Sequence, residues 1–254
     1  MNTVDVARRH ELILQSLRQG RRVGVGALAE LVQASEMTVR RDLDVLERDG
    51  LLRRVRGAAV GMLTGEETPY AARARQRLEA KRRIGHAVAE LLDDGETVVL
   101  DGGTTTLEVA RRLTDRRVTV LPLSLHSVDV LRTADQVRVV LPGGELRPGE
   151  LAFGGPLTLY AFQVMRFDTV VLGCCGLSAA NGVSAHDLAE VAVKRAAVDA
   201  SARVVAAVDS SKLGRTAFGR VCPAREVDVL VTDEDAPEDE VARLRKAGVE
   251  VRLV

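Results

Sequence analysis

The sequence contains few aromatic residues and few cysteines. Aromatic residues make up 2% of the 254 positions, and tryptophan is absent. Recognition of unpaired bases or sugars by stacking on aromatic side chains is therefore not expected. Of the three cysteines, Cys174 and Cys175 are adjacent and Cys222 stands alone. An odd count with an adjacent pair does not suit a secreted scaffold held by disulfides.

Net charge and long hydrophobic runs are also absent. The chain has 36 basic and 36 acidic residues, which excludes a basic coat over the whole protein. No apolar run approaches the roughly 20 residues that span a bilayer, and Asp5, Arg8 and Arg9 interrupt the first apolar residues. We expect a cytoplasmic protein without a signal peptide or a membrane partner. Basic charge is instead local, because residues 53–83 hold nine bases and three acids.

The first 60 residues have the pattern of a small helical domain with a hairpin. Apolar residues at helical spacing predict helices over 4–19, around 28–32 and over 35–49. A strand over 51–55, a tight turn and a returning strand over 58–60 follow. Two helices, a turn, a third helix and a hairpin indicate a winged helix-turn-helix DNA-binding domain over residues 1–60.

Beyond a linker at 61–80, where glycines and a proline break the periodicity, strands and helices alternate from residue 81 to residue 254. The apolar run 204–208 is typical of a strand that helices cover on both faces. This pattern predicts a mostly parallel, doubly wound α/β domain, which we interpret as a domain for effector binding and oligomerisation. The predicted strands are 97–101, 118–122, 137–141, 168–172, 203–208, 228–232 and 249–254, and the predicted helices are 81–92, 106–113, 127–133, 157–166, 187–201 and 237–247.

The third helix has the residues of a helix that reads the major groove. On a helical wheel Val39, Leu43 and Leu46 face the domain core, while Met37 and Arg41 point outward. Arginine can bond two acceptors of guanine, and methionine can pack against a thymine methyl. A salt-bridged, solvated helix face is the alternative, but the turn before this helix and the basic hairpin after it favour DNA binding. The candidate DNA contacts are Ser35, Met37, Thr38, Arg40, Arg41, Arg53, Arg54 and Arg56.

The predicted strand 97–101 runs through Asp101, Gly102, Gly103, Thr104 and Thr105 straight into a helix. Glycines let backbone N–H groups approach an anion, threonine hydroxyls add donors, and a helix N-terminus favours negative charge. The run lacks the Gly-Lys-Ser/Thr ending of a P-loop. It indicates a phosphate-binding loop, with an ordinary strand-to-helix turn as the alternative.

Several polar or glycine-rich loops follow other predicted strands. Since ligands bind at the carboxyl ends of parallel strands, we expect these loops to meet at one edge of the sheet. The candidate effector contacts are Asp101, Gly102, Gly103, Thr104, Thr105, Ser124, Gly144, Gly173, Gly176, Lys194, Asp209 and Lys212.

These motifs together resemble the DeoR family of bacterial regulators. The resemblance rests on the run from Ser35 to Arg53, the Asp-Gly-Gly-Thr-Thr loop, the Val-Lys-Arg helix at Lys194 and the Asp-Ser-Ser-Lys segment ending at Lys212, and it covers nearly the whole chain. It implies a sensor domain that resembles sugar-phosphate isomerases in fold. It also implies a phosphate on the loop at Gly102–Thr105, with Lys212 or Lys194 as the counter-charge.

The sequence departs from the family pattern at two places. The wing has Arg56-Gly57-Ala58-Ala59 where the family usually has His-Gly-Gly-Ala, which alters the side chains available to DNA. After the second strand of the sensor domain, Pro122-Leu123-Ser124 stands where Thr-Asn-Ser is common. At Leu123 an amide that could bond the effector is thus replaced by an apolar side chain.

We therefore expect a regulator, most simply a repressor released from double-stranded operator DNA by a phosphorylated metabolite and acting as a dimer or tetramer. An activator remains open. The alternative class is an isomerase-like enzyme with an added DNA-binding domain, using Asp101, Asp209 and Lys212. We predict no cofactor and no metal, since the spacing of Cys174, Cys175 and His186 matches no common zinc pattern.

Overall fold

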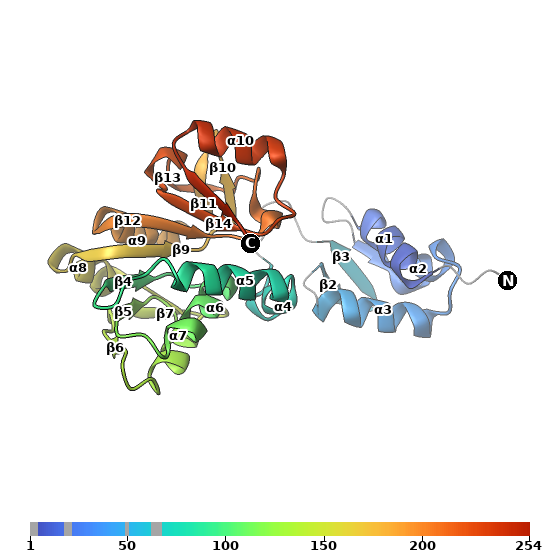
Figure 1. Cartoon of the computed structure of the whole chain (residues 1–254). Coiled ribbons are helices and arrows are strands. Elements are labelled where there is room, and N and C mark those ends of the chain that lie inside the picture. Colours follow the sequence, from blue (N-terminus) through green and yellow to red (C-terminus); the bar gives the residue numbers. More distant parts are fainter. Residues whose placement is uncertain (1–4, 18–21, 49–50, 62–67) are drawn as a thin grey trace. The chain divides into compact units, whose positions relative to one another are not determined.

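The change from helical periodicity to alternating strands and helices corresponds to two folding units in the computed structural model, which describes residues 5–17, 22–48, 51–61 and 68–254 (Figure 1). One unit comprises residues 1–76 and the other residues 77–254. The sequence places the unit boundaries at 60 and 80. Within that stretch the structure has helix α4 (Tyr70–Arg75) and the start of α5 (Leu78–Ala89), and residues 62–67 lie outside the described part.

The first unit is a winged helix-turn-helix, as predicted. Its helices are α1 (Val6–Ser16), α2 (Val25–Leu31) and α3 (Glu36–Arg48), and its strands are β1 (Arg22–Gly24), β2 (Leu52–Val55) and β3 (Ala58–Gly61). The predicted hairpin is the antiparallel pair of β2 and β3, and β1, too short to be predicted as a strand, pairs with β3. The predicted helix ends at 4, 18–19 and 49 lie outside the described residues.

A buried ion pair fixes α3 to α1. The Arg9 guanidinium donates two hydrogen bonds to the Asp42 carboxylate, with N–O distances of 2.5 and 3.0 Å. His10 Nε2 lies 3.1 Å from the same carboxylate. Burial opposes the charge of Asp42, but its hydrogen bonds with Arg9 and His10 hold the pKa of the carboxyl below its ordinary value. Asp42 is therefore an interior residue, whereas the sequence suggested a possible place on a solvated helix face.

Replacing Asp42 by asparagine should destabilise the first unit by about 3 kcal/mol, because the Arg9 charge would stay buried without its partner. The matched control is Asp44→Asn on the same helix, whose carboxylate is about half exposed and pairs with Arg54. We expect that change to cost below about 1 kcal/mol. Hydrogen exchange of the α3 amides in the full-length protein measures both effects. Equal losses for the two variants would contradict the structural role of the buried pair.

The second unit is built on a seven-stranded sheet in which every neighbouring pair is parallel. The strand order is β15-β14-β12-β9-β4-β5-β6. The seven predicted strands are confirmed with shifted ends: β4 (Thr97–Leu100), β5 (Thr119–Pro122), β6 (Arg138–Val139), β9 (Phe167–Leu172), β12 (Ser201–Ala207), β14 (Val229–Thr232) and β15 (Glu250–Leu253).

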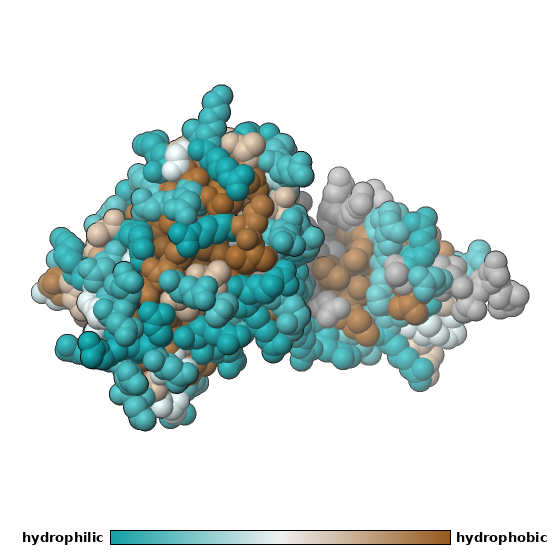
Figure 2. Space-filling view, in the orientation of Figure 1, coloured by the Kyte–Doolittle hydropathy of each residue, from teal (hydrophilic) through white to brown (hydrophobic). Residues whose placement is uncertain are grey.

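Helices cover both faces of this sheet, and the strand residues alternate between the two hydrophobic clusters. Val98 and Leu100 pack in the cluster that includes residues of α5, α6 (Thr104–Leu113) and α7 (Leu125–Leu131). Val99 packs in the opposite cluster, with residues of α8 (Pro156–Val164), α9 (Leu188–Asp199) and α10 (Glu238–Lys246). The doubly wound α/β fold predicted from the sequence is thus confirmed. Figure 2 shows hydrophobic residues reaching the surface of this unit between α10 and α5.

Helices α5 and α6 pack unusually closely (Figure 1). A Cβ atom placed on Gly85 of α5 would lie 2.7 Å from the backbone carbonyl carbon of Glu108 in α6. Real Cβ atoms do not approach backbone atoms so closely, so only glycine permits this contact.

The sequence did not predict two small antiparallel elements that lie outside the main sheet. The strands β7 (Glu145–Arg147) and β8 (Ala152–Gly154) form a hairpin. The strands β10 (Gly176–Ser178), β11 (Gly182–Ala185) and β13 (Gly219–Cys222) form a three-stranded sheet. Each of these strands has only three or four residues, and all of them except β7 contain glycine, a residue typical of loops. Among the described helices, none is long and apolar enough to cross a membrane.

Candidate nucleic-acid interface and effector site

Helix α3 presents the outward face that the helical wheel predicts. Val39 and Leu43 are fully buried, whereas Met37 is 61% exposed and Arg41 is exposed. The hydroxyl of Ser35 accepts a hydrogen bond from the backbone N–H of Thr38, and the two hydroxyls are 3.0 Å apart. Ser35 thus caps the N-terminus of the helix.

The arginines of this surface fall into two groups. Arg40 pairs with Glu36 at 2.9 Å, and Arg54 of the wing pairs with Asp44. The exposed side chains of Arg41, Arg53 and Arg56 form no ion pair with any described residue. These three are therefore free to meet an external anion without breaking an internal contact.

In the second unit some of the predicted effector residues, those that follow β4 and β9, lie at the switch point of the sheet. Helix α6 leads from β4 to β5 on one side, whereas β9 and β12 continue the sheet on the other side of β4. In open α/β sheets ligands bind outside the carboxyl ends of the strands at such a point. Asp101 directly follows β4, and Gly173 directly follows β9.

A buried network joins these two strand ends. The Asp101 carboxylate accepts hydrogen bonds from the backbone N–H groups of Gly102 and Gly173, both at 2.8 Å, and from the Lys194 ammonium. The ammonium also donates to the carbonyl of Gly173 at 2.9 Å and pairs with Glu190 at 3.0 Å. The structure therefore brings Asp101, Gly102, Gly173 and Lys194 together.

The ammonium of Lys194 is fully engaged by its partners in this network. Its side chain is 2% exposed. Burial opposes its charge, but the carboxylates of Asp101 and Glu190 outweigh that cost and hold the pKa of the lysine above its ordinary value. A cation with three internal partners and almost no exposed surface stabilises the strand ends more readily than it binds a phosphate.

Lys212 differs from Lys194 in these respects. It ends the short 3-10 helix η2 (Ser210–Lys212), which follows Asp209 at the end of β12, and its side chain is half-buried. Its ammonium forms no hydrogen bond or ion pair with the described residues. Of the two lysines in the predicted site, Lys212 is the one that is free to bind an anion.

The predicted phosphate-binding loop begins α6. Gly103 is the N-cap residue with φ of 136°, a backbone conformation that side chains disfavour. Thr104, Thr105 and Thr106 form the first turn, where the sequence predicted the helix to start only at 106. The hydroxyl of Thr106 donates to the carbonyl of Gly103, while those of Thr104 and Thr105 bind no other described group. The N–H groups and two free hydroxyls at this helix start suit an anion.

Three other predicted residues have structural tasks that the sequence did not indicate. A Cβ atom on Gly144 would lie 2.3 Å from the carbonyl oxygen of Gly154, and one on Gly176 would lie 2.5 Å from that of Arg215. Both glycines permit close backbone packing. The hydroxyl of Ser124 accepts a hydrogen bond from the N–H of His126 and caps α7.

Leu123 does not replace an amide in an open site. It is 2% exposed and packs in the hydrophobic cluster beneath the sheet with Leu121 and Phe162. The leucine that stands in place of the asparagine common in the family therefore adds an apolar side chain to the core.

Sequence reasoning missed two arginines that contact the site. Arg147 of the β7–β8 hairpin pairs with Glu190 at 3.0 Å and lies 3.7 Å from Asp187. Arg77 lies 3.8 Å from Asp209. Neither belongs to a recognisable motif, because each reaches the site from an element distant in sequence.

The cysteines are poorly suited to nucleophilic or metal-binding chemistry. Burial raises the pKa of Cys222 to about 11 and that of Cys174 further, so both thiols stay protonated near neutral pH. Among the described residues no cluster of three or more His, Cys, Asp or Glu side chains could hold a metal.

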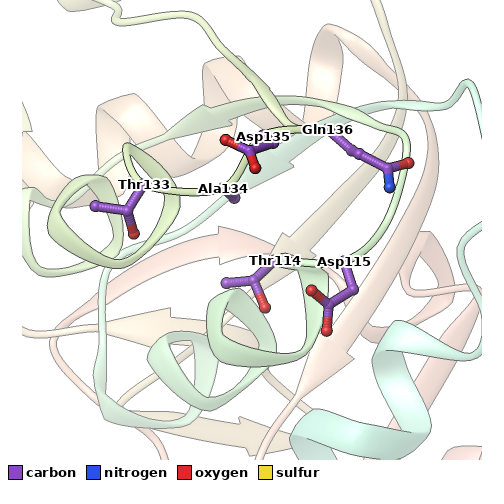
Figure 3. A pocket seen from close by; sticks show the side chains of 6 residues that line it. All are labelled: Thr114, Asp115, Thr133, Ala134, Asp135 and Gln136. Atoms are coloured by element: carbon purple, nitrogen blue, oxygen red, sulfur yellow. The ribbon is translucent and has the colours of Figure 1, made fainter.

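A depression of about 200 Å³ lies at the amino ends of the strands, opposite the edge where the predicted effector residues lie (Figure 3). It has two carboxylates and no basic residue, which disfavours a phosphate. It is lined by Thr114, Asp115, Thr133, Ala134, Asp135 and Gln136.

The two lysines of the site should respond differently to the same substitution. Lys194→Met leaves Asp101 buried without its cation, and we expect a loss of about 3 kcal/mol in the free energy of unfolding of the second unit. Lys212→Met should change that free energy by less than about 0.5 kcal/mol. Urea unfolding followed by circular dichroism measures both. A large loss for Lys212→Met would show that this lysine also has a structural partner.

The comparisons with known proteins cover both units. Residues 9–62 match the DeoR-like helix-turn-helix domain, and residues 76–234 match the DeoR C terminal sensor domain. The glycerol-3-phosphate regulon repressor of Escherichia coli K12 is 31% identical over 96% of this chain and 98% of its own length. The transcriptional repressor AccR of Agrobacterium fabrum is 33% identical over 89% of this chain and 88% of its own. The repressor GlcR of Bacillus subtilis is 31% identical over 94% and 93%.

A solved structure of ribose 5-phosphate isomerase from Methanocaldococcus jannaschii covers 54% of this chain and 55% of its own, with 14% identity and a TM-score of 0.41. So distant a similarity carries no argument about activity. The family matches and the relatives are regulators and not enzymes, so the isomerase alternative is set aside. The chain belongs to the DeoR family of DNA-binding transcription regulators.

Proposed function

We propose that this protein is a cytoplasmic repressor that binds double-stranded operator DNA with its first unit. A phosphorylated sugar or a related metabolite, bound by the second unit, releases it from the DNA. Helix α3 enters the major groove, and the β2–β3 wing contacts the neighbouring backbone or minor groove. The ligand binds at the carboxyl edge of the parallel sheet.

For the DNA interface the support is the exposed face of α3. Arg41 and Met37 project from it, and Val39 and Leu43 hold its other face in the core. The capped N-terminus at Ser35 adds backbone donors for a phosphate. Arg53 and Arg56 extend the positive charge along the wing.

For the effector, one observation carries the proposal. The start of α6, with Gly103 and two unengaged threonine hydroxyls, lies at the switch point of the sheet, where a ligand is expected. Lys212, in the 3-10 helix η2 that follows β12, has an ammonium that binds no described residue. Backbone N–H groups, hydroxyls and one cation form a donor set that suits a phosphate. The glycerol-3-phosphate regulon repressor is named for a phosphorylated metabolite.

We also propose that the protein acts as a homo-oligomer, a dimer or a tetramer. Repressors with this fold read two half-sites, which requires two copies related by symmetry. One face of α8 supports a second copy as its occupant, because Leu157, Tyr160 and Val164 lie three and four residues apart and are each more than half exposed.

Fluorescence anisotropy with the intergenic DNA upstream of the protein's own gene tests the proposed function. Titrations at two salt concentrations, with and without a panel of sugar phosphates, should show selective binding that one compound weakens. Selective binding untouched by the whole panel would contradict the phosphorylated effector. Absence of selective binding at both salt concentrations would contradict the repressor.

Two arginines of the interface should differ in what they contribute. Arg41→Ala should weaken operator binding by about 1–3 kcal/mol and lower the preference over unrelated DNA. Arg53→Ala should weaken binding to all sequences alike and reduce the salt dependence by about one phosphate contact. Anisotropy at several salt concentrations separates the two effects, with Arg243→Ala in the second unit as control. Equal losses on operator and unrelated DNA for Arg41→Ala would exclude base reading by this residue.

Tyr160→Glu should dissociate the oligomer by placing a charge in the apolar contact of α8. Sedimentation velocity measures the change in mass, and Arg166→Glu beyond the end of the same helix is the control. An unchanged sedimentation coefficient for Tyr160→Glu would mean that copies associate through another surface.

A further inference from the structure

Arg77, the first residue of the second unit, has an unusual backbone. Its φ of 53° and ψ of 35° lie in the left-handed region, and it directly precedes α5. A residue with a bulky side chain adopts this conformation only when its surroundings hold it there. Such outliers often occur at sites that switch between states.

Three carboxylates hold its guanidinium. Arg77 Nη2 lies 2.6 Å from Asp233 and 2.7 Å from Asp235, and Nε lies 3.8 Å from Asp209. Asp233 directly follows β14, and Asp209 lies two residues beyond the end of β12, at the edge of the sheet where the proposed effector site lies. Both are almost fully buried. The point at which the chain enters the second unit is thus bonded to the ligand edge of the sheet.

The same two carboxylates also hold η2, which carries Lys212. Asp233 accepts a hydrogen bond from the N–H of Ser210 at 2.7 Å. Asp209 accepts from the N–H of Ser211 at 3.1 Å and from its hydroxyl at 2.5 Å. Arg77 and η2 therefore share the same two carboxylates. A change in the position of η2 changes the other hydrogen bonds that these carboxylates accept beside Arg77.

We infer that Arg77 is a positioning residue that couples η2 to the chain segment leading from the DNA-binding unit. An anion bound by Lys212 and Ser211 draws the Ser211 hydroxyl away from Asp209. The carboxylate of Asp209 then attracts Arg77 more strongly, and the strained backbone at Arg77 shifts. Since α4 ends only two residues earlier, at Arg75, the shift reaches the segment that carries the first unit. This inference rests on the proposed effector site, and it states how ligand binding at that site reaches the segment leading from the DNA-binding unit.

An ordinary structural ion pair would have a different signature. It would stabilise the second unit, and its loss would loosen the neighbouring backbone to the same extent whatever the state of η2. Coupling requires that a change at η2 alters the backbone around Arg77 only while the guanidinium is present. That difference is measurable without any ligand.

The test is a double-mutant cycle in the full-length protein, followed by hydrogen exchange. Ser211→Ala removes one hydroxyl from Asp209 and leaves the charges unchanged. We expect it to slow exchange in peptides covering residues 72–83 by about fivefold, the lower end of measured couplings between sites. In the Arg77→Met background the same change should have an effect below about twofold. The control is Ser211→Ala combined with Arg82→Met, since Arg82 is exposed on α5 and pairs only with Glu79 among the described residues.

The exchange rates of the double-mutant cycle are sufficient to support or overturn the coupling between η2 and Arg77. Slowing that depends on Arg77 and persists in the Arg82→Met background supports the coupling. An effect of Ser211→Ala that is equal with and without Arg77, or no effect in either, overturns it. Because Ser211→Ala is a small change at a half-buried position, a failure to fold is not expected to obscure the result.

Inorganic phosphate provides a second arm. It should slow exchange in residues 209–213 in both the wild type and Arg77→Met, but slow residues 72–83 only where Arg77 is present. Loss of protection at both segments in Arg77→Met would mean that Arg77 supports the site itself, against the coupling. No protection of 209–213 in the wild type would count against the phosphate effector, while the ligand-free cycle would still decide the role of Arg77.

Discussion

The second unit depends on one buried ion pair, between Asp101 and Lys194. It joins the ends of β4 and β9, the two strands at which the chain order of the sheet reverses. Parallel strands expose unpaired backbone groups at this edge, and a ligand site must leave some of them open. The carboxylate of Asp101 binds two backbone N–H groups, and the ammonium of Lys194 binds a carbonyl. The pair thus provides hydrogen-bond partners inside the protein for these backbone groups. The remaining donors are then held in place for an anion.

The two units use buried charge in the same way. In the first, Arg9 and Asp42 connect α1 with α3, so the helix that carries the outward arginines cannot rotate about its axis. In the second, Lys194 orders the loops around the ligand edge. A buried pair adds little net stability, but it fixes one arrangement, since any other would leave a charge without a partner. Both pairs lie next to residues for which we propose contacts with DNA or ligand.

The fold followed from the sequence because its signals are periodic. Apolar residues at helical spacing, as in α3, and continuous apolar runs, as in β12, allowed the class of each unit and its longer elements to be predicted. The short strands around Gly176 and Glu145 could not be predicted, since three residues carry no period. The site was predicted in part. Loops at strand ends were recognisable as motifs, but whether Lys194 or Lys212 has a free charge depends on contacts 93 residues apart in sequence, such as that between Asp101 and Lys194.

The close packing of α5 on α6 at Gly85 has a consequence for inherited variation. Because a Cβ atom at position 85 would meet the backbone of Glu108, the two helices can lie at this distance only while that residue is glycine. A mutation to any larger residue there would force the helices apart and displace α6, which begins with the turn proposed to bind the effector. Ligand preference would then change through a position outside the proposed site.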